Sequence, residues 1–166
     1  MQFFISRFLL GGAPHKVPNG AAGSARSAVN WVTEKGSGKQ YAELAKLADD
    51  YDDAEMRCAA IGGMLPEPRT REETDFLDNM GETMVMFFLG MTDLADEGEW
   101  VWTSDGSPVT WIVSVEGEPD GGTDENCGVM ARKYLVGNTT APIWGSGECG
   151  NPYNLPVTVV CEKTRK

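Results

Sequence analysis

The stretch "AEMRCAAIGGMLPEPRTREETDFL", residues 54–77, has the pattern of two helices separated by a glycine pair. Apolar residues from Tyr51 to Ile61 recur at steps of three and four, which predicts the first helix. Asp49 or Asp50 precedes it and can act as its N-cap, while the glycine pair ends it. This periodicity places Cys58 on the buried face of the helix.

The second helix of this stretch has a capping signal of its own. Thr70 and Glu73 have the spacing of a capping box, and apolar residues between Phe76 and Met80 form one face. Gly81 follows the last apolar residue. The sequence therefore predicts a short amphipathic helix from about Thr70 to Gly81.

The segments on either side favour strands. Residues 39–48, "KQYAELAKLA", alternate well enough to predict a strand. From residue 84 onward, short apolar runs such as "WVW", "VTWIV" and "VTVVCE" are split by Gly, Pro, Asp and Ser, which is typical of strands and loops. "GSPVTW", residues 106–111, predicts a turn followed by a strand. Residues 93–126 are unusually rich in loop formers, and long ordered loops often carry function.

Length and charge limit the possible classes of protein. A chain of 166 residues supports one domain with a real core, to which we assign the tryptophans at 100, 102, 111 and 144. Its net charge of −11 disfavours nucleic acid as a partner, because binding a phosphate backbone relies on Lys and Arg. No apolar run approaches the roughly 20 residues that cross a bilayer.

Residues 1–30 read as a flexible arm or a remnant leader, and residues 31–166 as the folded domain. The arm is rich in Gly, Ala, Ser and Pro and has no apolar periodicity. Phe3 to Ala13 resembles the apolar part of a secretion signal, but Arg7 interrupts it and no basic residue precedes it. A degraded leader, an internal fragment and an ordinary tail all stay open.

The four cysteines point to an oxidising compartment. They include no C-x-x-C pair, and the only histidine is His15 in the arm, so a zinc site of the usual spacing is not expected. An even count at wide spacing favours two disulfides, for which three pairings are possible. Asn138 begins an "NTT" glycosylation sequon, which agrees with a secreted or extracellular glycoprotein.

Acidic residues are concentrated between Asp93 and Glu125, where ten of them occur without a Lys or Arg. Crowded carboxylates repel each other unless water, a cation or protonation relieves them, and Ca²⁺ takes six to eight oxygen ligands. A calcium-binding loop and a solvated acidic loop both fit, although the spacing is not that of an EF-hand. Without a histidine near the domain or a marked carboxylate pair, we expect a binding protein and not an enzyme.

Several motifs together resemble the C-type lectin-like domain, over residues 31–162. The cysteine, "GGML" turn and second helix of residues 54–77 resemble the start of that family's fold. Further similar segments are "FFLGMTD" followed by "EGEWVWTSDG", then "EPD", "ENC", "IWGSGEC" and "VVCEK". The resemblance implies an α+β fold with two helices flanking two small antiparallel sheets and a long irregular ligand-binding loop. It also implies the disulfides Cys58–Cys161 and Cys127–Cys149, with chain termini that lie close together.

The resemblance further implies a calcium site in the long loop. In sugar-binding members, Ca²⁺ is held by the polar residues of E-P-N or Q-P-D, the acid of E-N-C, and the Asn and Asp of W-N-D, and two sugar hydroxyls complete its coordination. Carried over, Glu118, Asp120 and Glu125 match, Asn126 stands at a neighbouring ligand position, and Pro119 is expected to be cis.

An auxiliary calcium site is also implied, because Asp93 and Glu97 match the spacing of a second site found in some members. From composition alone, we expect both side chains to be solvated or locally hydrogen-bonded.

The sequence departs from the family pattern at W-N-D, where it has Trp144, Gly145 and Ser146. Loss of both polar ligands is expected to weaken calcium binding. Asp120 makes the motif "EPD", which is neither E-P-N nor Q-P-D, so the sugar class is not indicated.

We expect a carbohydrate-binding domain that is assisted by Ca²⁺ and has a glycan or glycoprotein as its partner. The alternative is a calcium-independent protein-interaction, adhesion or mineral-associated module, because the fold does not decide the function. A homo-oligomer would add multivalency, although the arm shows no heptad repeat.

Overall fold

The computed structural model describes residues 28–81, 83–114, 116–119, 122–151 and 156–164. The predicted arm, residues 1–30, lies outside this part of the chain except for its last three residues. Within the described residues, the first regular element begins at Val32. In chain order the elements are β1 (Val32–Thr33), β2 (Gln40–Ala48), α1 (Tyr51–Ala60), α2 (Arg71–Asp78), β3 (Val85–Thr92), β4 (Val101–Trp102), η1 (Gly122–Asp124), β5 (Cys127–Val136), β6 (Thr139–Gly147) and β7 (Val157–Lys163).

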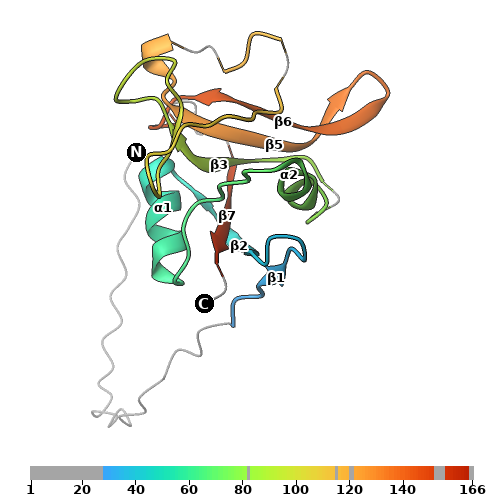
Figure 1. Ribbon diagram of the computed structural model, residues 1–166. Helices are drawn as coiled ribbons and strands as arrows, with labels where there is room; N and C mark the ends of the chain where they lie inside the picture. Colours follow the sequence, from blue (N-terminus) through green and yellow to red (C-terminus); the bar gives the residue numbers. More distant parts are fainter. Residues whose placement is uncertain (1–27, 82, 115, 120–121, 152–155, 165–166) are drawn as a thin grey trace, which may run out of the picture.

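The strands form one curled sheet in the order β1-β2-β7-β3-β5-β6, with β4 beside β3 (Figure 1). Two antiparallel groups make up this sheet, β1-β2-β7 and β3-β5-β6 with β4. In the part of the chain that is described, one parallel pair, Met86 with Val157, joins them. The two small antiparallel sheets expected from the family resemblance are therefore present and connected along one seam.

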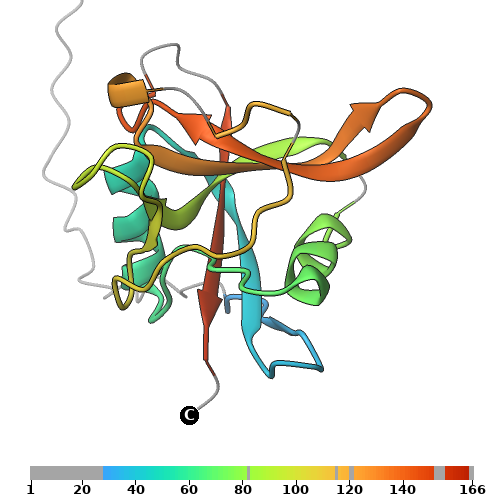
Figure 2. The same ribbon diagram turned by 45° about the horizontal axis from the view of Figure 1, so that its top comes forward.

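The two helices lie on opposite sides of the β2-β7 ribbon (Figure 2). Helix α1 has Asp50 and not Asp49 as its N-cap, because the Asp50 side chain accepts a hydrogen bond from Asp53 N–H at 2.7 Å. Helix α2 has Thr70 as its N-cap, and the Thr70 hydroxyl accepts from Glu73 N–H at 3.2 Å, as the capping signal predicted. It ends at Asp78, three residues before the expected stop.

The sheet has a hydrophobic cluster on each face because side chains alternate along its strands. On the α2 side, Phe87, Met130 and Trp144 belong to the larger cluster, which also includes the buried Trp100 and Trp102. The tryptophans are thus part of the core, as predicted, and Trp111 packs against them in edge-to-face contact with Trp144. On the α1 side, a second cluster surrounds Cys58 and Phe88.

The prediction of a strand in residues 106–111 was wrong. Trp102 N–H donates to Ser107 O at 2.9 Å and Val109 N–H to Trp100 O at 2.8 Å, so the expected turn is present. Beyond it only an isolated bridge joins Val101 and Pro108, because proline has no N–H to continue a ladder. The following residues pass over β6, where Val113 O accepts from Trp144 N–H.

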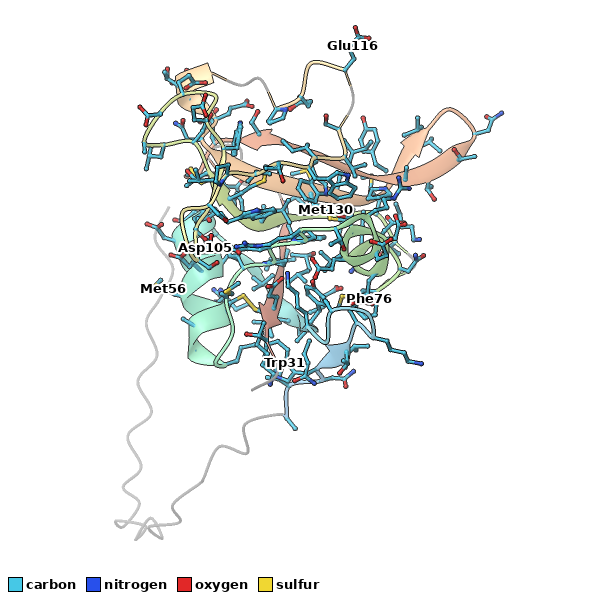
Figure 3. The ribbon with its side chains drawn as sticks, viewed as in Figure 1. Trp31, Met56, Phe76, Asp105, Glu116 and Met130 are labelled. Atoms are coloured by element: carbon cyan, nitrogen blue, oxygen red, sulfur yellow. A yellow bond between two sulfur atoms is a disulfide. The ribbon has the colours of Figure 1, made fainter. Side chains whose placement is uncertain are left out.

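Both implied disulfides are confirmed. Cys58–Cys161 ties α1 to β7, and Cys127–Cys149 ties the start of β5 to the segment after β6. The ends of the described domain also meet, since the Lys163 ammonium lies 4.0 Å from the centre of the Trp31 ring. Trp31 is labelled at this end of the molecule in Figure 3.

A buried group of charges, which we call the Lys39 cluster (Lys39, Glu67, Glu73 and Glu162), connects β7 to the base of the long loop. All three glutamates are at most 3% exposed. The Lys39 ammonium lies 3.2 Å from both the Glu73 and Glu162 carboxylates and donates to Glu67 O at 2.6 Å. Glu67 N–H donates to Glu162 at 2.8 Å, and the Glu67 carboxylate accepts from Ser104 N–H at 2.8 Å.

Among the described residues, no helix combines the length and the apolar character needed to cross a membrane.

Gly63 is expected to be intolerant of a side chain. A Cβ at this position would lie 2.8 Å from Glu162 O and 2.9 Å from the Trp31 ring. We expect Gly63→Ala to lower the free energy of unfolding by about 1–3 kcal/mol, as overpacking usually does. Gly150→Ala is the matched control, because no atom of the described residues lies within 4 Å of its Cβ position. Urea denaturation of both variants measures the difference, and equal stability of the two would contradict this account.

Candidate functional site

The long loop between β3 and β5 lies over the β5-β6 side of the sheet (Figure 1). As predicted, its described residues contain little regular structure, only β4 and the short η1 turn. Glu116, labelled in Figure 3, is exposed and points away from the sheet. Glu118, two residues later, is half-buried against β6.

Glu118 and Glu125 meet at a single residue of β6. Ser146 N–H donates to Glu118 Oε2 at 3.2 Å, and the Ser146 hydroxyl donates to Glu125 Oε2 at 3.1 Å. The Glu118–Pro119 peptide bond is cis, as expected. Two of the three predicted ligands therefore converge, on the residue where W-N-D would supply its aspartate.

Gly145 leaves the space that the Glu118 carboxylate occupies. A Cβ on Gly145 would lie 2.9 Å from Glu118 Oε2 and 3.4 Å from its carboxyl carbon. Because β6 has no side chain here, Glu118 approaches the strand backbone closely. The replacement of W-N-D by Trp-Gly-Ser thus changes the site in two ways, removing two ligands and bringing Glu118 onto the strand.

Asn126 is held by local contacts at the end of the loop. Its side-chain amide donates to Thr123 O at 2.8 Å, and its backbone carbonyl accepts from the Thr92 hydroxyl at 2.7 Å. Cys127 follows directly and is fixed by its disulfide. The positions of Glu125 and Asn126 therefore depend on this covalent anchor.

Asp93 and Glu97 lie in different environments. Asp93 is 3% exposed and accepts from Gly98 N–H at 3.0 Å, whereas Glu97 is exposed. The other oxygen of Asp93, Oδ1, is buried and has no hydrogen-bond partner among the described residues. An orphaned carboxylate oxygen is compatible with a cation, because Ca²⁺ takes carboxylate oxygens as ligands.

Asp120 lies outside the described residues. In the part of the chain that is described, no three acidic, Cys or His side chains are grouped closely enough to hold a metal ion. Glu118 and Glu125 alone supply two carboxylates, fewer than the oxygen ligands that Ca²⁺ requires. The described donors fit a calcium site in part, and further oxygens would have to come from Asp120, backbone carbonyls, water or the ligand.

The turn at the base of the loop contains an ion pair between Asp105 and Arg69. Hydrogen bonds from the Ser107 hydroxyl and N–H, together with Arg69, hold the pKa of Asp105 below its usual range. Asp105 therefore stays ionised and paired with Arg69 at 3.0 Å. Its contacts with Ser107 and Arg69 stabilise the turn at the base of the loop.

A model of the family described as the lectin C-type domain matches residues 48–163. The chain belongs to this family. The lectin domain accounts for both helices, the disulfides and the strands that carry the candidate site.

Three comparisons illustrate the range of its relatives. The perlucin-like protein of Mytilus galloprovincialis is 31% identical over 83 residues, which are 48% of this chain and 53% of that protein, so the chain spans about half of that relative's length. The carbohydrate-recognition domain of the mouse scavenger receptor C-type lectin has a TM-score of 0.61 at 25% identity, covering 82% of this chain and 96% of the other. A calcium-independent type II antifreeze protein has a TM-score of 0.62 at 23% identity, covering 84% and 98%, and shares the fold alone.

Asn138 lies at the exposed tip of the β5-β6 hairpin. An enzyme that attaches a glycan could reach it there, and its glycosylation stays a prediction.

Sequence reasoning missed two features of the site. It treated Ser146 only as a lost ligand, whereas this residue contacts both carboxylates. It also missed a hollow beside Glu118 that is lined by apolar residues of β3, β5 and β6. The consecutive apolar residues Val129, Met130 and Ala131 were the available signal, because successive side chains of a strand point to opposite faces and such a run makes both faces of β5 apolar.

Proposed function

We propose that this lectin domain binds a carbohydrate in an extracellular setting, with Ca²⁺ held by Glu118, Asp120 and Glu125. The observation that carries the proposal is the convergence of the Glu118 and Glu125 carboxylates on Ser146. When bound, the cation would coordinate vicinal hydroxyls of the sugar. Asn126, and Asp93 with Glu97, are proposed as contributors to neighbouring calcium positions.

The protein side chains orient this site. The disulfide at Cys127 anchors the end of the loop, and the η1 turn places Glu125 through the bond from Glu125 N–H to Gly122 O at 3.0 Å. Glu118 comes from an earlier part of the same loop and contacts β6 through the hydrogen bond from Ser146 N–H. The two disulfides also support an oxidising, extracellular location with a glycan or glycoprotein as partner, and a homo-oligomer would strengthen weak single-site binding.

A second candidate is a calcium-independent interaction or adhesion module. The hydrogen bonds from Ser146 favour it, because they hold both carboxylates to β6 through protein contacts. The fold is shared with a calcium-independent antifreeze protein, so the fold by itself does not decide between the two candidates.

Calorimetric titration of Ca²⁺ into chelator-treated protein tests the first candidate. We expect saturable binding that Glu118→Gln weakens roughly tenfold or more, because it removes a charged oxygen ligand. Glu116→Gln is the matched control, since it makes the same change on an exposed side chain of the same loop. Equal affinity of the two variants would contradict the assignment of Glu118.

The substitution Gly145→Asn with Ser146→Asp provides the reverse experiment. It restores the missing amide and carboxylate, and we expect calcium affinity to rise roughly tenfold or more. The end of the Glu118 side chain must move to admit the new Cβ, which is inexpensive for a flexible side chain. A glycan array with and without chelator then tests for sugar. Absence of calcium binding by the wild type at millimolar concentration would favour the second candidate.

A further inference from the structure

The described residues cover one face of the β3-β5-β6 sheet incompletely. The strand register places two rows of side chains on this face: Met86, Ala131 and Ile143 in one row, and Phe88, Val129 and Gly145 in the next. Helix α1 and the Cys58 cluster cover Phe88, which is 3% exposed. The residues of the first row are only half-buried.

The uncovered part forms a hollow of about 210 Å³, which we call the Met86 hollow. Its apolar lining includes Met86, Val129, Ala131 and Ile143, and Glu118 and Tyr134 also line it. The absence of a side chain at Gly145 keeps the hollow open beside the Glu118 carboxylate. The Met86 hollow is therefore continuous with the proposed calcium and sugar site.

The chemistry of the Met86 hollow limits what can occupy it. Hydroxyl groups of a second sugar would lose their hydration against the methyl and thioether groups, which is costly without compensating hydrogen bonds. An apolar cavity of roughly 150 Å³ is large enough to bind benzene, so the hollow has room for one aromatic ring. Met86 supplies a thioether, and the 45% exposed Tyr134 supplies a ring, both of which favour contact with an aromatic group.

We propose that the Met86 hollow binds an aromatic group attached to the sugar held at Glu118, which makes aryl glycoconjugates the preferred ligand class. This inference rests on the proposed function for the position of the sugar. The hollow supplies affinity through burial of the ring, and the loop supplies the polar contacts. Specificity therefore depends on both parts of the ligand.

A second hollow, of about 360 Å³, is the competing location. It shares Met86 but is otherwise lined by residues such as Leu47 and Met84 that do not surround Glu118. A ring bound there would lie away from the loop carboxylates. The two locations can be separated by variants in each hollow.

The first experiment uses the full chain labelled with ¹³C at its methionine methyl groups, with the Met86→Leu variant assigning the Met86 signal. Benzyl alcohol is the probe, and we expect it to shift the Met86 signal in wild-type protein. Ala131→Leu fills the Met86 hollow and should abolish the shift, whereas Leu47→Ser alters only the second hollow and should preserve it. A saturating titration that leaves Met86 unmoved, or a shift that Leu47→Ser abolishes, would overturn the proposal.

The second experiment compares methyl and benzyl glycosides of mannose and galactose by calorimetry in the presence of Ca²⁺. We expect the benzyl glycoside of the accepted sugar to bind about tenfold more tightly than the methyl glycoside, because the ring is buried. Ala131→Leu should reduce this ratio to about one. Equal affinity of the wild type for the methyl and benzyl glycosides would overturn this inference without contradicting the sugar site. If none of the four glycosides binds while benzyl alcohol still shifts the Met86 signal, the sugar site is overturned and binding of an aromatic ring in the Met86 hollow is supported.

Discussion

Replacement of Cys58 and Cys161 by alanine is expected to destabilise the domain by about 5 kcal/mol, close to the whole stability of many domains of this size. The disulfide closes a loop with a sequence separation of 103 residues. In the chain-entropy description, removing a crosslink returns to the unfolded chain the conformational freedom that loop closure had removed, and this freedom increases with loop length. Both sulfurs also lie in fully buried residues of the α1-side core, so their loss leaves a small void.

The Cys127–Cys149 disulfide provides the internal comparison. Its sequence separation is 22 residues, for which the same relation gives about 3 kcal/mol. Urea denaturation of the two double-alanine variants measures both losses, and a larger loss for the shorter loop would contradict the entropic account. Cys127 directly follows Asn126. For each kcal/mol of stability lost, we therefore expect replacement of Cys127 and Cys149 to lower calcium affinity more than replacement of Cys58 and Cys161.

The second large effect is expected for Lys39→Met, which removes the only ammonium in the Lys39 cluster. Glu73 and Glu162 would then be buried near each other without this partner. Removing one member of a buried ion pair usually costs about 3–5 kcal/mol, because the remaining charge is uncompensated. We expect a loss of this size at pH 8, measured by urea denaturation.

The pH dependence follows from Glu162. Burial, opposed by Lys39, raises the pKa of Glu162 to about 7 from an ordinary value of 4.5. A folded-state pKa above the unfolded value means that the folded protein binds the proton more tightly, so this stabilisation is fully present below about pH 4.5 and is lost as the pH rises through 7. The free energy of unfolding should therefore fall by up to about 3 kcal/mol between pH 5 and pH 8.

Two variants test this sign. Glu162→Gln cannot titrate, so its stability should change much less between pH 5 and pH 8 than that of the wild type. Lys39→Met should be more damaging at pH 8 than at pH 5, because Glu162 is largely protonated in the acid. Arg71→Met serves as the surface control, since its ion pair with Asp75 is exposed and should contribute at most about 0.5 kcal/mol. If the free energy of unfolding of the wild type increased from pH 5 to pH 8 while that of Glu162→Gln did not, the role of Glu162 would be refuted.

Local signals were sufficient for the elements that depend on neighbouring residues. The caps at Asp50 and Thr70, the helices α1 and α2, and the strand β2 were predicted because each depends on groups within a few positions along the chain. The disulfide pairing came from the family resemblance, because four cysteines by themselves permit three pairings.

Segments whose structure depends on distant partners were predicted less well. "GSPVTW" has strand-like composition, yet Pro108 and the contact of Val113 with β6 keep it out of the sheet. The Lys39 cluster was not anticipated, because its members come from positions 39, 67, 73 and 162 and only folding brings them together.

By itself, the sequence determined the acidic loop, the helix caps, the loss of the W-N-D ligands and membership of a recognisable family. Only the tertiary structure decided that Ser146 lies between Glu118 and Glu125, and that Gly145 opens an apolar hollow beside them. The physical reason is that composition and capping act over a few residues, whereas the site requires a loop and a strand that are about 20 to 30 residues apart to meet. Such long-range contacts are fixed by sheet register and disulfides, which local sequence patterns do not specify.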